Sequence, residues 1–90
     1  MTRYTRRQIV ELLEVEEELV LALEREEVIE SEDADAYSEQ MLERVRVAAN
    51  LMADLDVNLP GVAIIVRLRE ELSTTRRQLE DLARRLQAKG

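Results

Sequence analysis

Residues 5–26, TRRQIVELLEVEEELVLALERE, predict two short helices in direct succession. Thr5 and Gln8 have the spacing of a capping box, in which the hydroxyl caps the helix and the glutamine amide returns to the N–H group of the cap. The first helix is expected over about 5–13. The second is expected over about 16–26, with three acids in its first turn, where the helix dipole favours negative charge. The apolar positions recur at helical spacing and should face inward: Ile9, Leu12, Leu13, Leu19, Val20 and Leu23.

A small β wing and a third helix are expected after this pair. Val28-Ile29 and Ala36-Tyr37 are β-prone pieces on either side of the polar stretch 30–35, which is the pattern of a short hairpin. Ser38 then caps a helix that runs to about Leu55. Spacings of three and four residues place one apolar stripe on this helix: Met41, Val45, Ala48, Met52 and Leu55.

The longest helix is expected at the C-terminal end of the chain. Asn58 is a favourable N-cap residue, and Pro60 lies in the first turn, where its missing N–H group costs nothing. The helix extends to about Ala88 and carries a heptad seam. The members of the seam are Ile65, Leu68, Leu72, Thr75, Leu79, Leu82 and Leu86.

Self-association through the distal half of this seam is the expected role of the last helix. The three shorter helices offer too little surface to bury the whole seam, so its distal half should pack on another chain as an antiparallel homodimer. The alternative is that the same side chains fold back on their own chain. The residues expected to hold the dimer are Leu72, Leu79, Leu82 and Leu86.

These elements predict an all-α, mainly helical fold with one domain. Ninety residues are enough for a single small core. We divide the domain into residues 1–58, a winged helix-turn-helix with its third helix, and residues 59–90, a long coiled-coil-like C-terminal helix.

The chain lacks the side chains that most catalytic and metal sites need. It has no cysteine and no histidine, which excludes thiolate chemistry, disulfides and a histidine general base. Asp33-x-Asp35 begins like a calcium loop, but the sixth position is not glycine and Arg44 stands where the closing glutamate belongs. We therefore expect no enzymatic activity, no catalytic residue, no metal and no cofactor. No apolar run approaches the roughly 18 residues of a membrane span, so we expect a cytoplasmic protein with no membrane partner.

Charge is distributed unevenly along the chain, whose net charge is −7. Residues 1–9 carry three arginines and no acid, residues 10–44 carry fourteen acids against two bases, and residues 45–90 carry six acids against eight bases. An acidic first half repels phosphate backbones and attracts basic partners. The alternative for most of these acids is a solvated surface without a partner.

The order of the elements resembles the MerR-type winged helix-turn-helix. The resemblance rests on Tyr4-Thr5, Ile9, Val15, Val28-Ile29 and Tyr37 with the stripe that follows it. DNA-binding members of that family carry a hydroxyl residue, an arginine and aromatics on the second helix. This chain departs from that pattern with Leu19, Leu21, Ala22 and Leu23, and with Glu14 and Glu27 at two positions where the family usually has glycine.

A more particular resemblance covers residues 51–63, LMADLDVNLPGVA. This stretch is similar to the one that opens the last helix of CbpM-type chaperone modulators, and the Arg/Leu/Gln/Glu-rich ending over 72–86 is similar as well. Such modulators bind the J-domain of a DnaJ-like co-chaperone and limit its work with the Hsp70 chaperone DnaK. The resemblance therefore implies a J-domain as the partner, with DnaK as a possible further one.

An acidic face of the helix-turn-helix is the expected partner surface. A J-domain offers DnaK a basic helix, and an acidic face could cover that helix and compete. Leu21 would supply the apolar anchor, because its register lies opposite the inward face. The acids expected to make the contact are Glu14, Glu17, Glu18, Glu24 and Glu27.

Two other functions stay open at this point. One is a dimeric MerR-type transcriptional regulator with Arg3, Arg6, Arg7 and the basic tail on DNA. Arg25 is the only base in the second helix, and a duplex binder needs lysine or arginine to displace counterions, so we expect no specific DNA binding. The other is a dimerisation module with no partner beyond itself.

Overall fold

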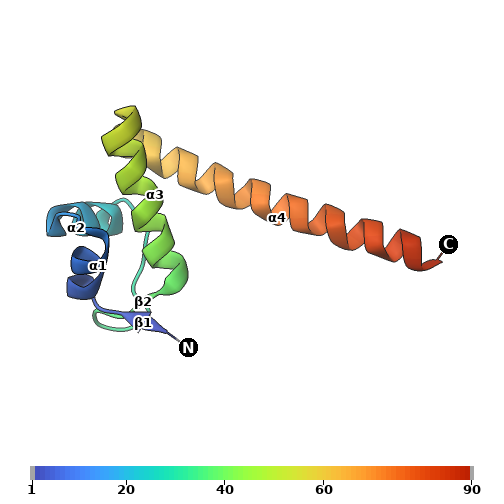
Figure 1. Cartoon of the computed structure of the whole chain (residues 1–90), viewed down its shortest axis with the longest axis horizontal. Helices are drawn as coiled ribbons and strands as arrows, with labels where there is room; N and C mark the ends of the chain where they lie inside the picture. Colours follow the sequence, from blue (N-terminus) through green and yellow to red (C-terminus); the bar gives the residue numbers. More distant parts are fainter. Residues whose placement is uncertain (1, 90) are drawn as a thin grey trace.

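The computed structural model describes residues 2–89 and is mainly helical, as expected. Figure 1 shows the last helix leaving the others, which gather at one end of the molecule, as a long rod. The molecule measures 53 × 32 × 20 Å. The elements in chain order are β1 (Arg3–Tyr4), α1 (Arg6–Leu13), α2 (Glu17–Arg25), β2 (Tyr37–Ser38), α3 (Glu39–Leu55) and α4 (Leu59–Lys89).

Each helix start that was predicted from a local cap is confirmed. Thr5 accepts a hydrogen bond from the Gln8 N–H at 3.1 Å, and the Gln8 side chain accepts from the Thr5 N–H at 2.9 Å, which completes the capping box of α1. Ser38 caps α3 by accepting from the Met41 N–H. Asn58 accepts from the Gly61 N–H at 2.9 Å at the start of α4. These bonds satisfy N–H groups that a helix end leaves without partners.

Both helices of the helix-turn-helix are followed by a residue in the left-handed backbone conformation. Glu14, after α1, has φ 53°, and Glu27, after α2, has φ 59°. At the second of these ends the Val28 N–H donates to the Leu23 carbonyl and the Glu27 N–H donates to the Glu24 carbonyl. That pairing is a Schellman motif, whose left-handed position favours glycine. Glutamate is strained there because its Cβ crowds the following carbonyl.

Replacing Glu14 or Glu27 by glycine is therefore expected to raise the free energy of unfolding. Relief of the strain stabilises the folded state by about 1–2 kcal/mol, whereas the extra freedom of glycine stabilises the unfolded chain by about 0.5–1 kcal/mol. A net gain of about 0.5–1 kcal/mol is therefore expected for each change. Urea unfolding followed by circular dichroism measures it. Glu18→Gly, inside α2, is the control and should destabilise. A loss of stability in all three variants would contradict the strain.

The small sheet is present, but one of its predicted strands is wrong. Arg3–Tyr4 pairs antiparallel with Tyr37–Ser38, with Tyr4 opposite Tyr37. Val28 and Ile29, expected as the first wing strand, form no strand because their N–H groups close α2 on the Leu23 carbonyl and their side chains are buried. Between them and β2 the wing holds only the isolated bridge of Asp33 with Ala36.

The core joins α1, α2 and α3 and takes only the first turns of α4. Met41, Val45 and Ala48 are buried, so the predicted stripe of α3 is confirmed along its first half. Leu55, at the end of the stripe, is 68% exposed, so the stripe is not buried along its whole length. The buried core residues are Ile9, Val20, Leu23, Val28, Ile29, Tyr37, Met41, Val45, Val47, Ala48, Val62 and Val66.

Gly61 allows the junction between α3 and α4 to be tight. A Cβ at this position would lie 2.8 Å from Cγ1 of Val57, which is closer than side chains tolerate. Val62 and Val66 follow and are the only residues of α4 within the described chain that are buried. Because both lie near the start of α4, the packing holds this helix by one end.

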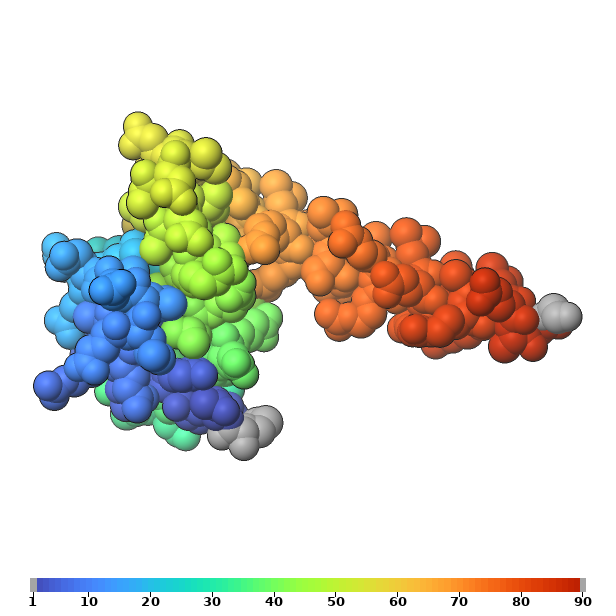
Figure 2. Space-filling model, in the orientation of Figure 1, coloured from blue at the N-terminus to red at the C-terminus, as the bar shows by residue number. Residues whose placement is uncertain are grey.

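The distal part of α4 stands free of the rest of the chain. Figure 2 shows the C-terminal half of the helix projecting into solvent. Leu72, Leu79, Leu82 and Leu86 are each more than half exposed, so the alternative that they fold back on their own chain is wrong. No helix of the described residues is long and apolar enough to cross a membrane. The division at residues 58 and 59 falls just before α4, and its outer limits, residues 1 and 90, lie outside the described residues.

Candidate interaction surfaces

The connection between α1 and α2 carries a group of exposed acids. We call Glu14, Glu16, Glu17 and Glu18 the acidic turn. Glu16 is the N-cap residue of α2, yet its side chain makes no capping hydrogen bond. Glu17 and Glu18 lie in the first helical turn, where the positive end of the helix dipole stabilises them. The structure therefore brings Glu14, Glu17 and Glu18 together at one end of α2.

The N-terminal arginines beside this turn already have acidic partners. Arg3 pairs with Glu32 at 2.8 Å, Arg6 with Glu17 at 3.5 Å and Arg7 with Glu11 at 3.4 Å. Pairs at an exposed surface are individually weak. Together they nevertheless place a carboxylate beside each of the three arginines of the first nine residues.

Glu24 does not belong to the exposed acidic face. It is half-buried, and its carboxylate accepts a hydrogen bond from the hydroxyl of Tyr37, which is 1% exposed. Burial of the ring and this bond to Glu24 raise the pKa of Tyr37 to about 12. The role of Glu24 in the structure is therefore to satisfy a buried hydroxyl, which differs from the partner contact expected of it.

Leu21 and Glu27 also lie apart from the acidic turn. Leu21 is half-buried instead of exposed, so it offers less apolar surface than expected. Glu27 follows the far end of α2 and lines a groove with Arg44 and Arg67. The nine residues of α2 separate it from the turn by about 13 Å. Of the six residues expected to contact a partner, only Glu14, Glu17 and Glu18 thus lie at the acidic turn.

A second surface is the exposed apolar face of α4, which we call the leucine stripe. Its members are Leu68, Leu72, Leu79, Leu82 and Leu86. Ile64 is 58% exposed one turn before Leu68 and was missed in the predicted seam, although its spacing of four residues from Leu68 was a usable signal. Exposed leucines at heptad spacing are the surface of a helix that packs against another helix.

Within residues 2–89, no group of three or more acids is placed so that it could hold a metal ion.

In comparisons with known proteins, a family model described as "MerR HTH family regulatory protein" matches residues 4–84. No curated protein and no solved structure matches the chain. The matched range includes the acidic turn and most of the leucine stripe.

Proposed function

We propose that this chain, which belongs to the MerR HTH family of regulatory proteins, is a non-enzymatic modulator of the DnaK/DnaJ chaperone system. In this proposal it acts in the cytoplasm by binding the J-domain of a DnaJ-like co-chaperone. The observation that carries the proposal is the acidic turn, which is exposed and leads into α2, the helix that would face DNA in a DNA-binding relative. A basic J-domain helix is a charge-complementary partner for it.

The surroundings of the acidic turn support the same partner. Leu19, at a position where DNA-binding relatives have polar or aromatic side chains, packs against the core. Arg6, the nearest base, is paired with Glu17. The start of α2 therefore presents carboxylates to a partner. Arg25 is the only base of this helix, and it lies at the other end. The similarity of residues 51–63 to CbpM-type modulators supports a J-domain among the possible basic partners.

A homodimer through the leucine stripe is part of the proposal. When Leu72 of one copy lies opposite Leu82 of a second, antiparallel copy, Leu68 lies opposite Leu86 and Thr75 opposite Leu79. Every exposed leucine of the predicted seam then has a partner. In the same register Glu71 of one copy lies beside Arg85 of the second, and the two-fold symmetry repeats this contact, so the dimer gains two ion pairs between the copies.

The charge distribution favours the antiparallel arrangement. Residues 1–58 carry sixteen acids and six bases, whereas residues 59–90 carry four acids and seven bases. An antiparallel pair brings the basic end of each α4 toward the acidic body of the other copy, and a parallel pair would bring the two basic ends together. The two acidic turns would then lie at opposite ends of the dimer, each free to bind one J-domain.

Calorimetric titration with the J-domain of a DnaJ-like protein tests the proposal. We expect saturable binding that weakens as salt is added, because the contacts are between charges. Glu14→Lys with Glu18→Lys should weaken it at least tenfold, which is about 1.4 kcal/mol. These two acids are chosen because Glu17 is already paired with Arg6, so its reversal would also break an ion pair within the chain.

A control of equal charge separates a local contact from a general one. Asp54→Lys with Glu80→Lys changes the net charge by the same amount at exposed positions away from α2 and should leave binding nearly unchanged. Both double variants should keep the helical circular dichroism of the parent. Absence of J-domain binding by the parent, or equal weakening in the two variants, would contradict the proposed surface.

A DNA-binding transcriptional regulator is the second candidate, and the family description favours it. Arg25 is exposed at the end of α2, and the basic residues of α4 could contact a duplex. The ion pairs of Arg3, Arg6 and Arg7 count against it, because each would have to be exchanged for a phosphate contact. Anisotropy titration with duplex DNA at physiological salt decides: sequence-dependent, sub-micromolar binding would replace the chaperone proposal with this one.

A further inference from the structure

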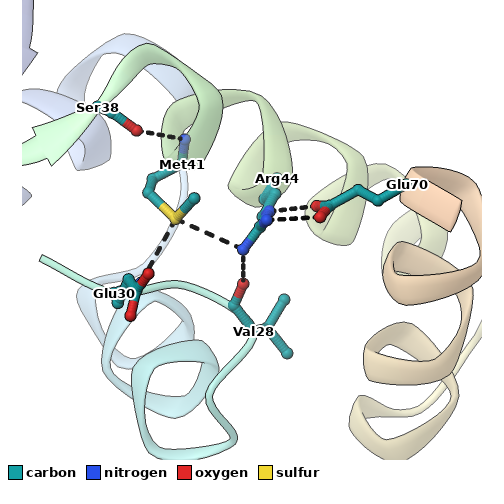
Figure 3. A network of polar contacts seen from close by, with 6 residues as sticks. All are labelled: Val28, Glu30, Ser38, Met41, Arg44 and Glu70. Atoms are coloured by element: carbon teal, nitrogen blue, oxygen red, sulfur yellow. Dashed lines mark hydrogen bonds and ion pairs between the residues drawn. The ribbon is translucent and has the colours of Figure 1, made fainter. Parts of the chain in front are cut away.

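One side chain, Arg44 of α3, joins three parts of the chain that are distant in sequence. Figure 3 shows its guanidinium between the segment after α2 and the side of α4. Nη1 donates to the Val28 carbonyl at 2.9 Å and Nη2 donates to Oε1 of Glu70 at 2.6 Å. Nε pairs with the second carboxylate oxygen of Glu70. Nε does not reach hydrogen-bond geometry with that oxygen, so Arg44 and Glu70 are joined by the one hydrogen bond from Nη2 and by the attraction of their opposite charges at close range.

The contact is more sheltered than the other ion pairs of the described chain. The side chain of Arg44 is 21% exposed and that of Glu70 is 40% exposed, the lowest exposure of any pair. The sulfur of Met41 also accepts from Nη1 of Arg44, at 3.7 Å, and from the Glu30 N–H. Arg44 is thus held on several sides, which makes it a poor candidate for a merely solvated surface charge.

The position of Glu70 along α4 gives the contact its consequence. Val62 and Val66 are the buried residues of this helix, and Glu70 follows Val66 by one turn. Beyond Glu70, every described residue of α4 except Asp81 is exposed. The apolar contacts at the start of α4 form a short strip about which the helix can tilt, and the ion pair lies at the end of that strip, where α4 leaves the body.

The other end of the contact reaches the cap of α2. The Val28 carbonyl binds Arg44, while the Val28 N–H closes α2 by donating to the Leu23 carbonyl at 2.9 Å. The direction of α4 is in this way tied to the end of the helix whose start carries the acidic turn.

We propose that Arg44 and Glu70 are positioning residues that set the direction in which α4 leaves the body. The helix extends 19 residues past Glu70, about 28 Å, so a tilt of about 10° at the contact moves its tip by about 5 Å. In a dimer built on α4, the same tilt changes the placement of one body relative to the other. This role requires no J-domain and stands or falls apart from the proposed partner.

Pulsed electron spin resonance between the body and the tip of α4 tests this role. The chain has no cysteine, so Glu11→Cys and Gln87→Cys accept two spin labels without competition, and both positions are exposed. Mixing with excess unlabelled chain removes distances between copies. The parent should show one narrow distance distribution, and Arg44→Met and Glu70→Gln should shift or broaden it by about 5 Å.

Matched variants distinguish positioning from general stability. Arg46→Met removes an arginine whose ion pair with Glu43 stays within α3, and it should leave the distribution unchanged. Glu70→Gln preserves the size of the side chain and serves if Arg44→Met fails to fold. Arg44→Lys keeps the charge without the planar guanidinium and should fall between the parent and Arg44→Met. A melting temperature lowered by Glu70→Gln or Arg44→Met with an unchanged distance distribution would overturn the proposal.

Discussion

Replacing Leu79 and Leu82 by alanine is expected to convert the proposed dimer of this chain into monomers. Both leucines are more than half exposed in the single chain, at 63% and 51%, so each has apolar surface that a second copy can bury. Burying one such leucine in the interface stabilises the dimer by roughly 2 kcal/mol more than burying an alanine there would. Because a two-fold interface repeats every change, the double variant loses this amount four times, roughly 8 kcal/mol.

Sedimentation equilibrium measures the mass directly. The parent should have the mass of two chains at micromolar concentration, and the double variant should have the mass of one. Leu12→Ala with Leu55→Ala is the control, since these leucines are 60% and 68% exposed but lie on the body away from α4's stripe. A monomeric parent, or a double variant that stays dimeric, would rule out the leucine stripe as the dimer interface.

Truncating Leu23 to alanine is expected to cause the largest loss of stability in the body. Leu23 is fully buried in α2, and its carbonyl also accepts the bonds that close this helix. Large-to-small changes at such positions cost about 2–5 kcal/mol, which is a large share of the roughly 5–15 kcal/mol that hold a domain together. A melting temperature lower by about 10 °C or more follows for a domain of this size.

Leu12→Ala in the neighbouring α1 provides the comparison. Leu12 was expected to face inward, yet it is 60% exposed, so its truncation should change the free energy of unfolding by no more than about 0.5 kcal/mol. Thermal melts followed by circular dichroism give both values. Similar losses for Leu12→Ala and Leu23→Ala would mean that α1 and α2 pack differently from the structure described above. Leu23→Ala should also weaken J-domain binding if the acidic turn depends on a folded α2.

The candidate surfaces were predictable to different degrees. The leucine stripe follows from periodicity alone, because a helix displays its own repeat wherever it lies. The acids at the start of α2 were predictable for the same reason. Glu24 was not, because its role depends on Tyr37, which comes from β2 on the other side of the wing. The half-burial of Leu21 likewise depends on neighbours that are distant in sequence.

The sequence by itself determined the features that rest on short-range contacts. The caps at Thr5, Ser38 and Asn58 each use a bond across three residues, so the residues that make it are always near one another. The unbroken length of α4 follows from similarly local preferences, because residues 61–89 contain no proline. The uneven charge of the chain is a property of composition and needs no fold.

Only the tertiary structure decided which distant groups meet. Tyr37 pairs with Tyr4 instead of with the β-prone piece before the wing, because burying Val28 and Ile29 in the core removes them from the ladder. Arg44 contacts Glu70, which lies 26 positions later in the sequence, and no local pattern around either residue predicts this pairing. Such pairings depend on the packing of whole helices against one core, so they follow from the sum of many weak contacts and not from any one stretch of sequence.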